Sequence, residues 1–123
     1  MVEFQEFELV NGLRVVFHQD RATPIVAFNV LYDVGARDED ENKTGFAHLF
    51  EHLMFGGSIN IPNFDSPLQA VGGENNAFTS NDITNYYITL PKSNIETAFW
   101  LESDRMLSLA FTEKSLEVQR QVV

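Results

Sequence analysis

The chain has 123 residues and a net charge of −10, because 18 aspartate and glutamate residues outnumber 8 lysine and arginine residues. An acidic surface repels phosphate, so this balance argues against a nucleic-acid-binding protein. The absence of cysteine excludes disulfides and thiolate metal sites. No apolar run approaches the roughly 20 residues that span a bilayer, and the N-terminus lacks the pattern of a signal peptide. The sequence therefore predicts a soluble protein with no membrane span, and a cytoplasmic location is favoured.

The sequence of the first third of the chain predicts a hairpin, a strand and a loop. Residues 7–17 largely alternate apolar and polar side chains around Asn11-Gly12, a dipeptide suited to a tight type I′ turn. The apolar run 25–32 predicts a central strand. The acidic residues 38–41 predict a solvated loop, because they lack the ligand spacing of a calcium-binding loop.

The rest of the chain predicts four helices and two strands. Thr44 and Thr112 are suited to cap the first and last of these helices. The predicted elements are a helix over 46–54 ended by Gly56-Gly57, a short helix over 65–71, strands at 76–79 and 83–90, a helix from Pro91 through Leu107, and a helix from 113 onward. This order predicts an α+β fold, with an antiparallel sheet and helices packed on one face.

The domain organisation follows from the hydrophobic content and from the last helix. A hydrophobic fraction of 44% is enough for one packed core, so we expect a single domain over residues 1–123. Residues 117–123 contain no glycine, proline or capping residue that would end a helix. We therefore expect the chain to be the N-terminal part of a larger domain.

Residues 48–52 (HLFEH) carry the most specific chemical pattern in the sequence. On a helix, His48 and His52 are four positions apart and share one face, and Glu51 points into the same broad sector. Two neutral imidazoles at this separation can hold one zinc ion and leave a carboxylate beside the metal's water. The alternative is a pair of ordinary histidines on an amphipathic helix. Two of the chain's three histidines fall in this pattern around a glutamate, which favours the metal site.

The segment 48–57 (HLFEHLMFGG) resembles the active-site helix of the pitrilysin family of zinc metallopeptidases, peptidase family M16. This family includes insulin-degrading enzyme and the mitochondrial processing peptidase, and H-x-x-E-H is its inverzincin signature. The resemblance extends along nearly the whole chain in the expected order. Its other parts are 11–15 (NGLRV), 35–39 (GARDE), 72–80 (GGENNAFTS), 84–87 (TNYY) and 100–106 (WLESDRM).

The resemblance implies a role for each residue of the motif. His48 and His52 would be ligands of Zn2+, and Glu51 would be the general base that takes a proton from the zinc-bound water. The family's third zinc ligand is a glutamate on a later helix, which by this alignment would lie three positions beyond Val123. The resemblance therefore implies a zinc metalloendopeptidase that is incomplete in this chain. Gln119 departs from the family pattern, since many relatives carry an acidic residue there.

Two further expectations concern the completeness of the site. Glu113 and Glu117 are the nearest acids that could replace the missing ligand, and both are predicted to be solvated surface carboxylates. The resemblance also implies a related second domain or subunit that contributes substrate-binding groups. We therefore expect weak zinc binding and little or no activity from residues 1–123 alone.

The five residues after the double glycine, Asn75, Asn76, Ala77, Phe78 and Thr79, suit an edge strand with accessible backbone groups. Such an edge can bind an extended peptide or an unfolded polypeptide by strand addition. The alternative is an ordinary strand after a flexible turn, and the sequence alone does not separate the two. The family resemblance favours substrate binding, because relatives hold substrate along the matching strand.

Three functions remain open from the sequence. The first is a zinc-dependent endopeptidase, the second is a non-catalytic peptide-binding or assembly module, and the third is a histidine-based metal-storage or sensor domain. A glutamate beside the histidine pair favours the peptidase, because the other two functions do not need it. The large aromatic side chains are expected in the core rather than in a ligand site; they are Tyr86, Tyr87, Phe99 and Trp100.

Overall fold

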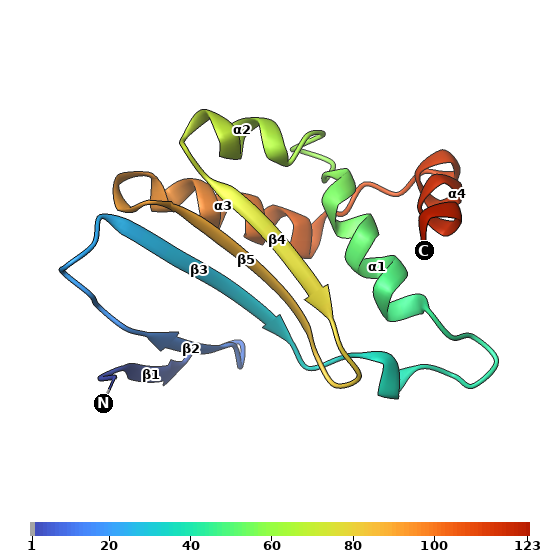
Figure 1. The fold of residues 1–123 in the computed structure, drawn as a ribbon, viewed down its shortest axis with the longest axis horizontal. Helices are drawn as coiled ribbons and strands as arrows, with labels where there is room; N and C mark the ends of the chain where they lie inside the picture. Colours follow the sequence, from blue (N-terminus) through green and yellow to red (C-terminus); the bar gives the residue numbers. More distant parts are fainter. Residues whose placement is uncertain (1) are drawn as a thin grey trace.

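The computed structural model describes residues 2–123 as an α+β fold, which confirms the predicted fold class (Figure 1). A three-stranded antiparallel sheet carries helices on one face, and a separate two-stranded hairpin precedes it. The strands are β1 (Gln5–Glu8), β2 (Arg14–Phe17), β3 (Ile25–Tyr32), β4 (Glu74–Thr79) and β5 (Thr84–Pro91). The helices are α1 (Phe46–Leu53), α2 (Asp65–Ala70), α3 (Ile95–Leu107) and α4 (Glu113–Val122). Single 3₁₀ turns are η1 (Ala36–Asp38), η2 (Met54–Gly56) and η3 (Lys92–Asn94).

The hairpin of β1 and β2 forms as predicted, but its turn is of another type. The amide of Gly12 donates to the carbonyl of Leu9 (2.9 Å), and the amide of Leu9 donates to the carbonyl of Leu13 (2.8 Å). Among the described residues only glycines have positive φ, Gly12 (φ 89°) being one of them. A type I′ turn needs positive φ at Asn11 as well, so the predicted turn type is wrong. The geometry is that of a three-residue loop closed by a left-handed glycine.

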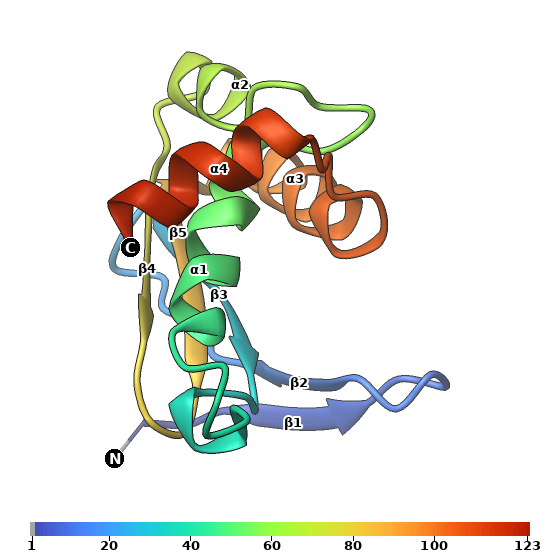
Figure 2. The same ribbon diagram turned by 90° about the vertical axis from the view of Figure 1, so that its right-hand side faces the viewer.

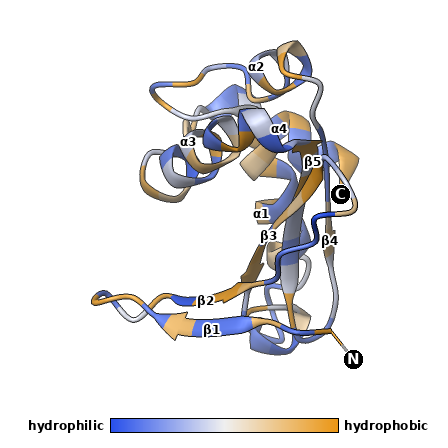
Figure 3. Ribbon diagram, turned by 90° about the vertical axis from the view of Figure 1, so that its left-hand side faces the viewer, coloured by the Kyte–Doolittle hydropathy of each residue, from blue (hydrophilic) through white to orange (hydrophobic). Residues whose placement is uncertain are grey.

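The hairpin extends away from the remainder of the molecule (Figure 3). Both strands carry exposed apolar side chains, including Phe7, Val16 and Phe17.

The main sheet has the order β3-β5-β4, so β5 is the central strand. Ile25 lies opposite Pro91 and Tyr32 opposite Thr84, which aligns β3 with β5 over its whole length. The prediction that residues 25–32 form a central strand is therefore wrong within the described chain, where β3 lies at an edge. Its side chains alternate between exposed and half-buried, because helices cover only one face of the sheet.

The hydrophobic core lies between that covered face and the helices α2 and α3. Alternate residues of β5 point into it, and Ile88 and Leu90 are at most 1% exposed. The other members of the core cluster are Ile61, Phe64, Leu68, Ala98 and Leu101.

The prediction that four aromatic residues lie in the core is wrong for three of them. Tyr86 is buried as predicted, but Tyr87 is 38% exposed because the next residue of a strand points to the opposite face. Phe99 and Trp100, both on α3, are more than half exposed. Phe99 nevertheless packs edge-on against Phe28, with ring centroids 4.8 Å apart.

A buried ion pair within α3 lies against the turn that follows α1. The guanidinium of Arg105 binds both carboxylate oxygens of Glu102, at 2.5 and 3.0 Å. It also lies 4.3 Å from the ring centroid of Phe64, 4.5 Å from that of Tyr86 and 5.6 Å from that of Phe55 in η2. Aromatic faces attract a cation, so Arg105 holds η2, and with it the end of α1, against the core.

Helix α1 begins with a cap that the sequence analysis did not predict. Gly45 is the N-cap residue with φ of 88°, and no side chain of its own can cap the helix. The carboxylate of Glu39 accepts hydrogen bonds from the amides of Gly45 and Ala47, each at 2.8 Å. Glu39 thus performs the role predicted for Thr44, and its charge is favourable at a helix N-terminus.

The later elements agree with the prediction in type and approximate position. Thr112 caps α4, because its hydroxyl accepts from the amide of Ser115 at 3.0 Å. The helix predicted from Pro91 begins at Ile95, after the 3₁₀ turn η3. None of the helices within residues 2–123 combines the length and the apolar character that crossing a membrane requires.

Candidate metal centre

Helix α1 lies between the β4 edge of the sheet and helix α4 (Figure 1; Figure 2). It contacts both elements, so its side chains can meet groups that are distant in the sequence. The motif of residues 48–52 lies on this helix, as the sequence predicts.

The two histidines of the motif converge. The Nε2 atoms of His48 and His52 are 3.1 Å apart, and their rings are nearly perpendicular at 81°. Two nitrogens that each lie about 2.0–2.1 Å from one tetrahedral zinc ion are separated by about 3.3 Å. The observed separation therefore fits two neighbouring positions around a single zinc ion. His48 is exposed and His52 is half-buried, so the pair is open to solvent on one side.

Glu51 is the most enclosed member of the motif. Its side chain accepts a hydrogen bond from the hydroxyl of Thr79, at the end of β4. Glu51 is 9% exposed. Burial raises the pKa of the neighbouring Tyr86 phenol above its usual value; Arg105 opposes this rise, and the Glu51 carboxylate adds to it. Glu51 thus lies at the boundary of the core, where its carboxylate is bound by the Thr79 hydroxyl.

Gln119 reaches the site from α4. Its Oε1 lies 3.2 Å from Nδ1 of His52, on the ring edge opposite the atom that faces His48. The sequence analysis treated Gln119 only as a departure from the family pattern. The contact joins residues 67 positions apart, so local spacing could not reveal it.

The acids of α4 do not complete the histidine pair. Glu117 is exposed and binds Arg120 at 3.3 Å, and Glu113 is also exposed, as expected. Across residues 2–123, no three side chains of histidine, cysteine, aspartate or glutamate gather closely enough to hold a metal ion. The described residues therefore bring together one pair of histidines, whereas a catalytic zinc site normally has three protein ligands.

Strand β4 places the predicted substrate-binding residues on an edge of the sheet. Asn75, Ala77 and Thr79 are half-buried, whereas Asn76 and Phe78 are exposed on the other face. β4 pairs with β5 along one side only, so its other edge has no strand partner within the described chain. The edge-strand geometry is therefore present, and Thr79 connects it directly to Glu51.

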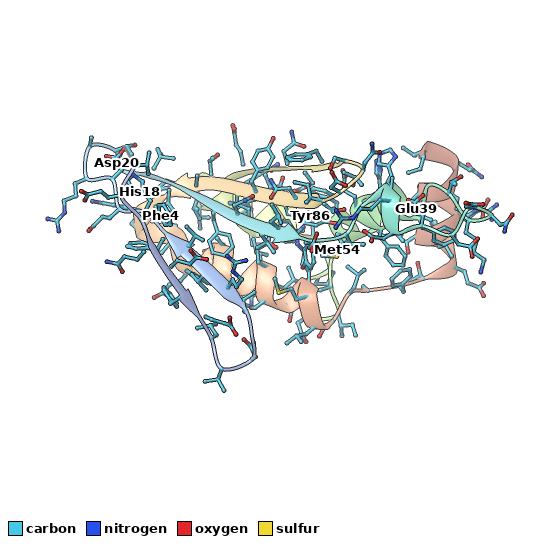
Figure 4. All side chains as sticks on the ribbon, turned by 90° about the horizontal axis from the view of Figure 1, so that it is seen from below. Phe4, His18, Asp20, Glu39, Met54 and Tyr86 are labelled. Carbon is cyan, nitrogen blue, oxygen red and sulfur yellow. The ribbon has the colours of Figure 1, made fainter. Side chains whose placement is uncertain are left out.

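A cavity of about 540 Å³ lies on the side of α1 that faces away from the histidines. Its wall includes Tyr32, Phe46, Phe50, Met54 and Tyr86. Glu39 lines the cavity as well, and Figure 4 labels it together with Met54 and Tyr86. The cavity separates α1 from the end of β3 and does not reach the histidine pair.

Comparisons with known proteins identify the family of the chain. Residues 14–123 match the family model described as insulinase, peptidase family M16. A zinc protease, PqqE, of Helicobacter pylori is 39% identical over 118 residues, which cover 94% of this chain and 27% of that protein. A probable mitochondrial-processing peptidase subunit beta of Arabidopsis thaliana is 30% identical over 117 residues, 94% of this chain and 22% of that protein.

Among solved structures, a protease from Helicobacter pylori superposes with a TM-score of 0.93 at 36% sequence identity. The superposition covers 99% of this chain and 30% of that one. The chain belongs to the insulinase family, peptidase family M16. It spans about a quarter of the length of the curated relatives that it matches.

Proposed function

We propose that this chain carries the zinc-binding helix of a zinc-dependent endopeptidase. The observation that supports the proposal most strongly is the convergence of the two Nε2 atoms of His48 and His52, 3.1 Å apart, on the helix that also carries Glu51. The relatives named as zinc proteases support the same metal and the same class of reaction.

In this proposal His48 and His52 hold the zinc ion through their Nε2 atoms. The bound ion would polarise a coordinated water and the scissile carbonyl, as a Lewis acid does. The carboxylate of Glu51 accepts a proton from the attacking water and passes it to the departing amine. The Thr79 hydroxyl fixes one oxygen of that carboxylate, so the other remains available for the proton.

The substrate is a peptide or an unfolded polypeptide in extended form. The free edge of β4 would pair with its main chain, which gives affinity with little dependence on sequence. Because Thr79 ends this strand and binds Glu51, a peptide on the edge would pass close to the proposed base.

With only His48 and His52 as proposed ligands, residues 2–123 would form an incomplete zinc site. We propose that a third ligand comes from outside these residues, and that a related second domain or subunit supplies further substrate contacts. The described part by itself would then bind zinc weakly and hydrolyse peptides slowly or not at all. A non-catalytic peptide-binding or assembly module is the second candidate, because a two-ligand site without turnover would also fit it.

Zinc binding and peptide hydrolysis, measured together, distinguish these functions. Calorimetric titration should show one zinc ion per chain, with binding lost in His48→Ala and kept in Glu51→Gln. Hydrolysis of a fluorogenic peptide library by the longest naturally expressed form of the protein should be lost in Glu51→Gln. Zinc binding without hydrolysis in the unaltered protein would favour the assembly module, and no zinc binding would contradict both the site and the peptidase.

A further inference from the structure

We infer that Gln119 is a positioning residue that sets the tautomer and orientation of His52. This inference deepens the proposed function, because it rests on His52 serving as a zinc ligand. It concerns a residue outside the H-x-x-E-H motif and assigns it a task in building the metal centre.

The position of Gln119 is fixed by the start of α4. The capping box of Thr112 and Ser115 joins the amide of each residue to the hydroxyl of the other, at 3.1 and 3.0 Å. Gln119 follows about one turn later on the face that contacts α1, and it is half-buried. Its Oε1 therefore meets Nδ1 of His52 from an ordered helix.

A neutral imidazole carries its proton on one nitrogen only. A carbonyl oxygen 3.2 Å from Nδ1 of His52 stabilises the tautomer with the proton on Nδ1. Nε2 of His52 is then left with its lone pair directed toward Nε2 of His48, 3.1 Å away. A metal ion requires that lone pair, so the contact with Gln119 prepares His52 for zinc.

Other polar side chains of α4 are engaged elsewhere. Glu117 accepts hydrogen bonds from Arg120 at 3.3 Å and from Gln121 at 3.4 Å, on the exposed side of the helix. Gln119 is the side chain of α4 that the structure places on the His52 ring. An amide oxygen can accept the Nδ1 proton without bringing a charge, so the glutamine is sufficient for this task.

The test combines a metal-free readout with zinc affinity. Long-range proton–nitrogen NMR of the chain without metal, at about pH 8 where imidazoles are neutral, should show His52 protonated on Nδ1. Gln119→Leu has a similar size and no acceptor, so it should shift His52 toward the other tautomer and weaken zinc binding by about 10- to 100-fold. Gln119→Glu restores an acceptor and should restore both properties. Gln121→Leu makes the same change two residues further on and should alter neither.

The outcomes separate this inference from the proposed function. His52 protonated on Nε2 in the unaltered chain, or equal zinc affinity in the unaltered chain and Gln119→Leu, would overturn the role of Gln119. The metal site itself would survive either result if zinc still binds. Failure of the unaltered chain to bind zinc would contradict the proposed function, and the metal-free tautomer would still decide whether Gln119 orients His52. A far-ultraviolet circular dichroism spectrum of each variant shows whether the helix content of the unaltered chain is retained.

Discussion

The hydroxyl of Thr79 donates a hydrogen bond to the carboxylate of Glu51, which connects the end of β4 to the last turn of α1. The two residues are 28 positions apart, so only the fold brings them together. This bond places the proposed proton acceptor beside the free edge of the sheet. Substrate binding and proton transfer would therefore take place at one junction between two elements.

Replacement of Thr79 by valine should slow peptide hydrolysis while zinc binding stays unchanged. A hydrogen bond to a charged group contributes about 1.5–3 kcal/mol, so we expect kcat to fall by about 10- to 100-fold. Steady-state kinetics on the longest naturally expressed form measures the effect. Thr79→Ser keeps the hydroxyl and should retain most of the activity. Equal rates for Thr79→Val and the unaltered protein would show that the bond does not orient Glu51.

Removal of the Glu39 carboxylate should destabilise the protein by exposing the first amides of α1. A lost helix cap costs about 1 kcal/mol of unfolding free energy, and Glu39 caps two amides, so Glu39→Ala should cost about 1–2 kcal/mol. Denaturant unfolding followed by circular dichroism provides the measurement. Glu41→Ala is the matched control, since Glu41 is exposed in the same loop. If both variants lose the same stability, the cap assigned to Glu39 is wrong.

Arg105→Met should be among the most destabilising single substitutions, because it leaves the buried Glu102 without its partner. Both side chains are at most 3% exposed, and breaking such a pair typically costs about 3–5 kcal/mol. Thermal unfolding of the single variant, compared with the double variant Arg105→Met/Glu102→Leu, should show recovery of much of the loss.

A surface pair is the control for this prediction. Arg120→Met breaks the exposed contact with Glu117 and should change the unfolding free energy by less than about 0.5 kcal/mol. No recovery in the double variant would mean that the cation–π contacts of Arg105, rather than the charge of Glu102, dominate its role.

Asp104 should contribute to stability near neutral pH, and its contribution should be lost below about pH 4. Hydrogen bonds from the Asn60 amide and the Ser58 hydroxyl lower the pKa of this carboxyl below its ordinary value. A lowered pKa in the folded state means that the contribution is complete above the unfolded value and is lost as the pH falls through the folded value. The difference in melting temperature between the unaltered protein and Asp104→Asn should therefore be constant above about pH 5 and shrink in more acidic buffer.

Glu96→Gln, which alters an exposed carboxylate of the same helix, is the control for Asp104. A difference for Asp104→Asn that persists unchanged through the most acidic buffers would contradict a charge-dependent role. The stability lost in acid should come from the segment that follows η2, because Ser58 and Asn60, the hydrogen-bond partners of Asp104, both belong to it.

Much of the fold could be predicted because its determinants are local. Thr112 caps α4 by binding the amide of Ser115, three residues further on. The helical spacing of His48 and His52 already places both rings on one face. The predictions were wrong where residues distant in the sequence determine the local structure or the burial of a side chain. The carboxylate of Glu39 caps α1 from a preceding loop, and exposure of Tyr87 depends on which face of the sheet the helices cover.

The same distinction holds for the candidate site. The sequence motif identifies the two imidazoles and Glu51, because one helical turn contains them all. The contacts of Thr79 and Gln119 depend on how β4 and α4 pack against that turn, and no local pattern encodes such packing. The sequence therefore predicts the groups proposed to do the chemistry, but not the contacts that Thr79 and Gln119 make with them.

Anomalous diffraction at the zinc absorption edge, from crystals equilibrated with zinc, would locate the metal directly. We expect one strong peak about 2.0–2.1 Å from Nε2 of both His48 and His52. A peak bound to only one of these imidazoles, or zinc bound elsewhere while this pair stays empty, would contradict the proposed metal site.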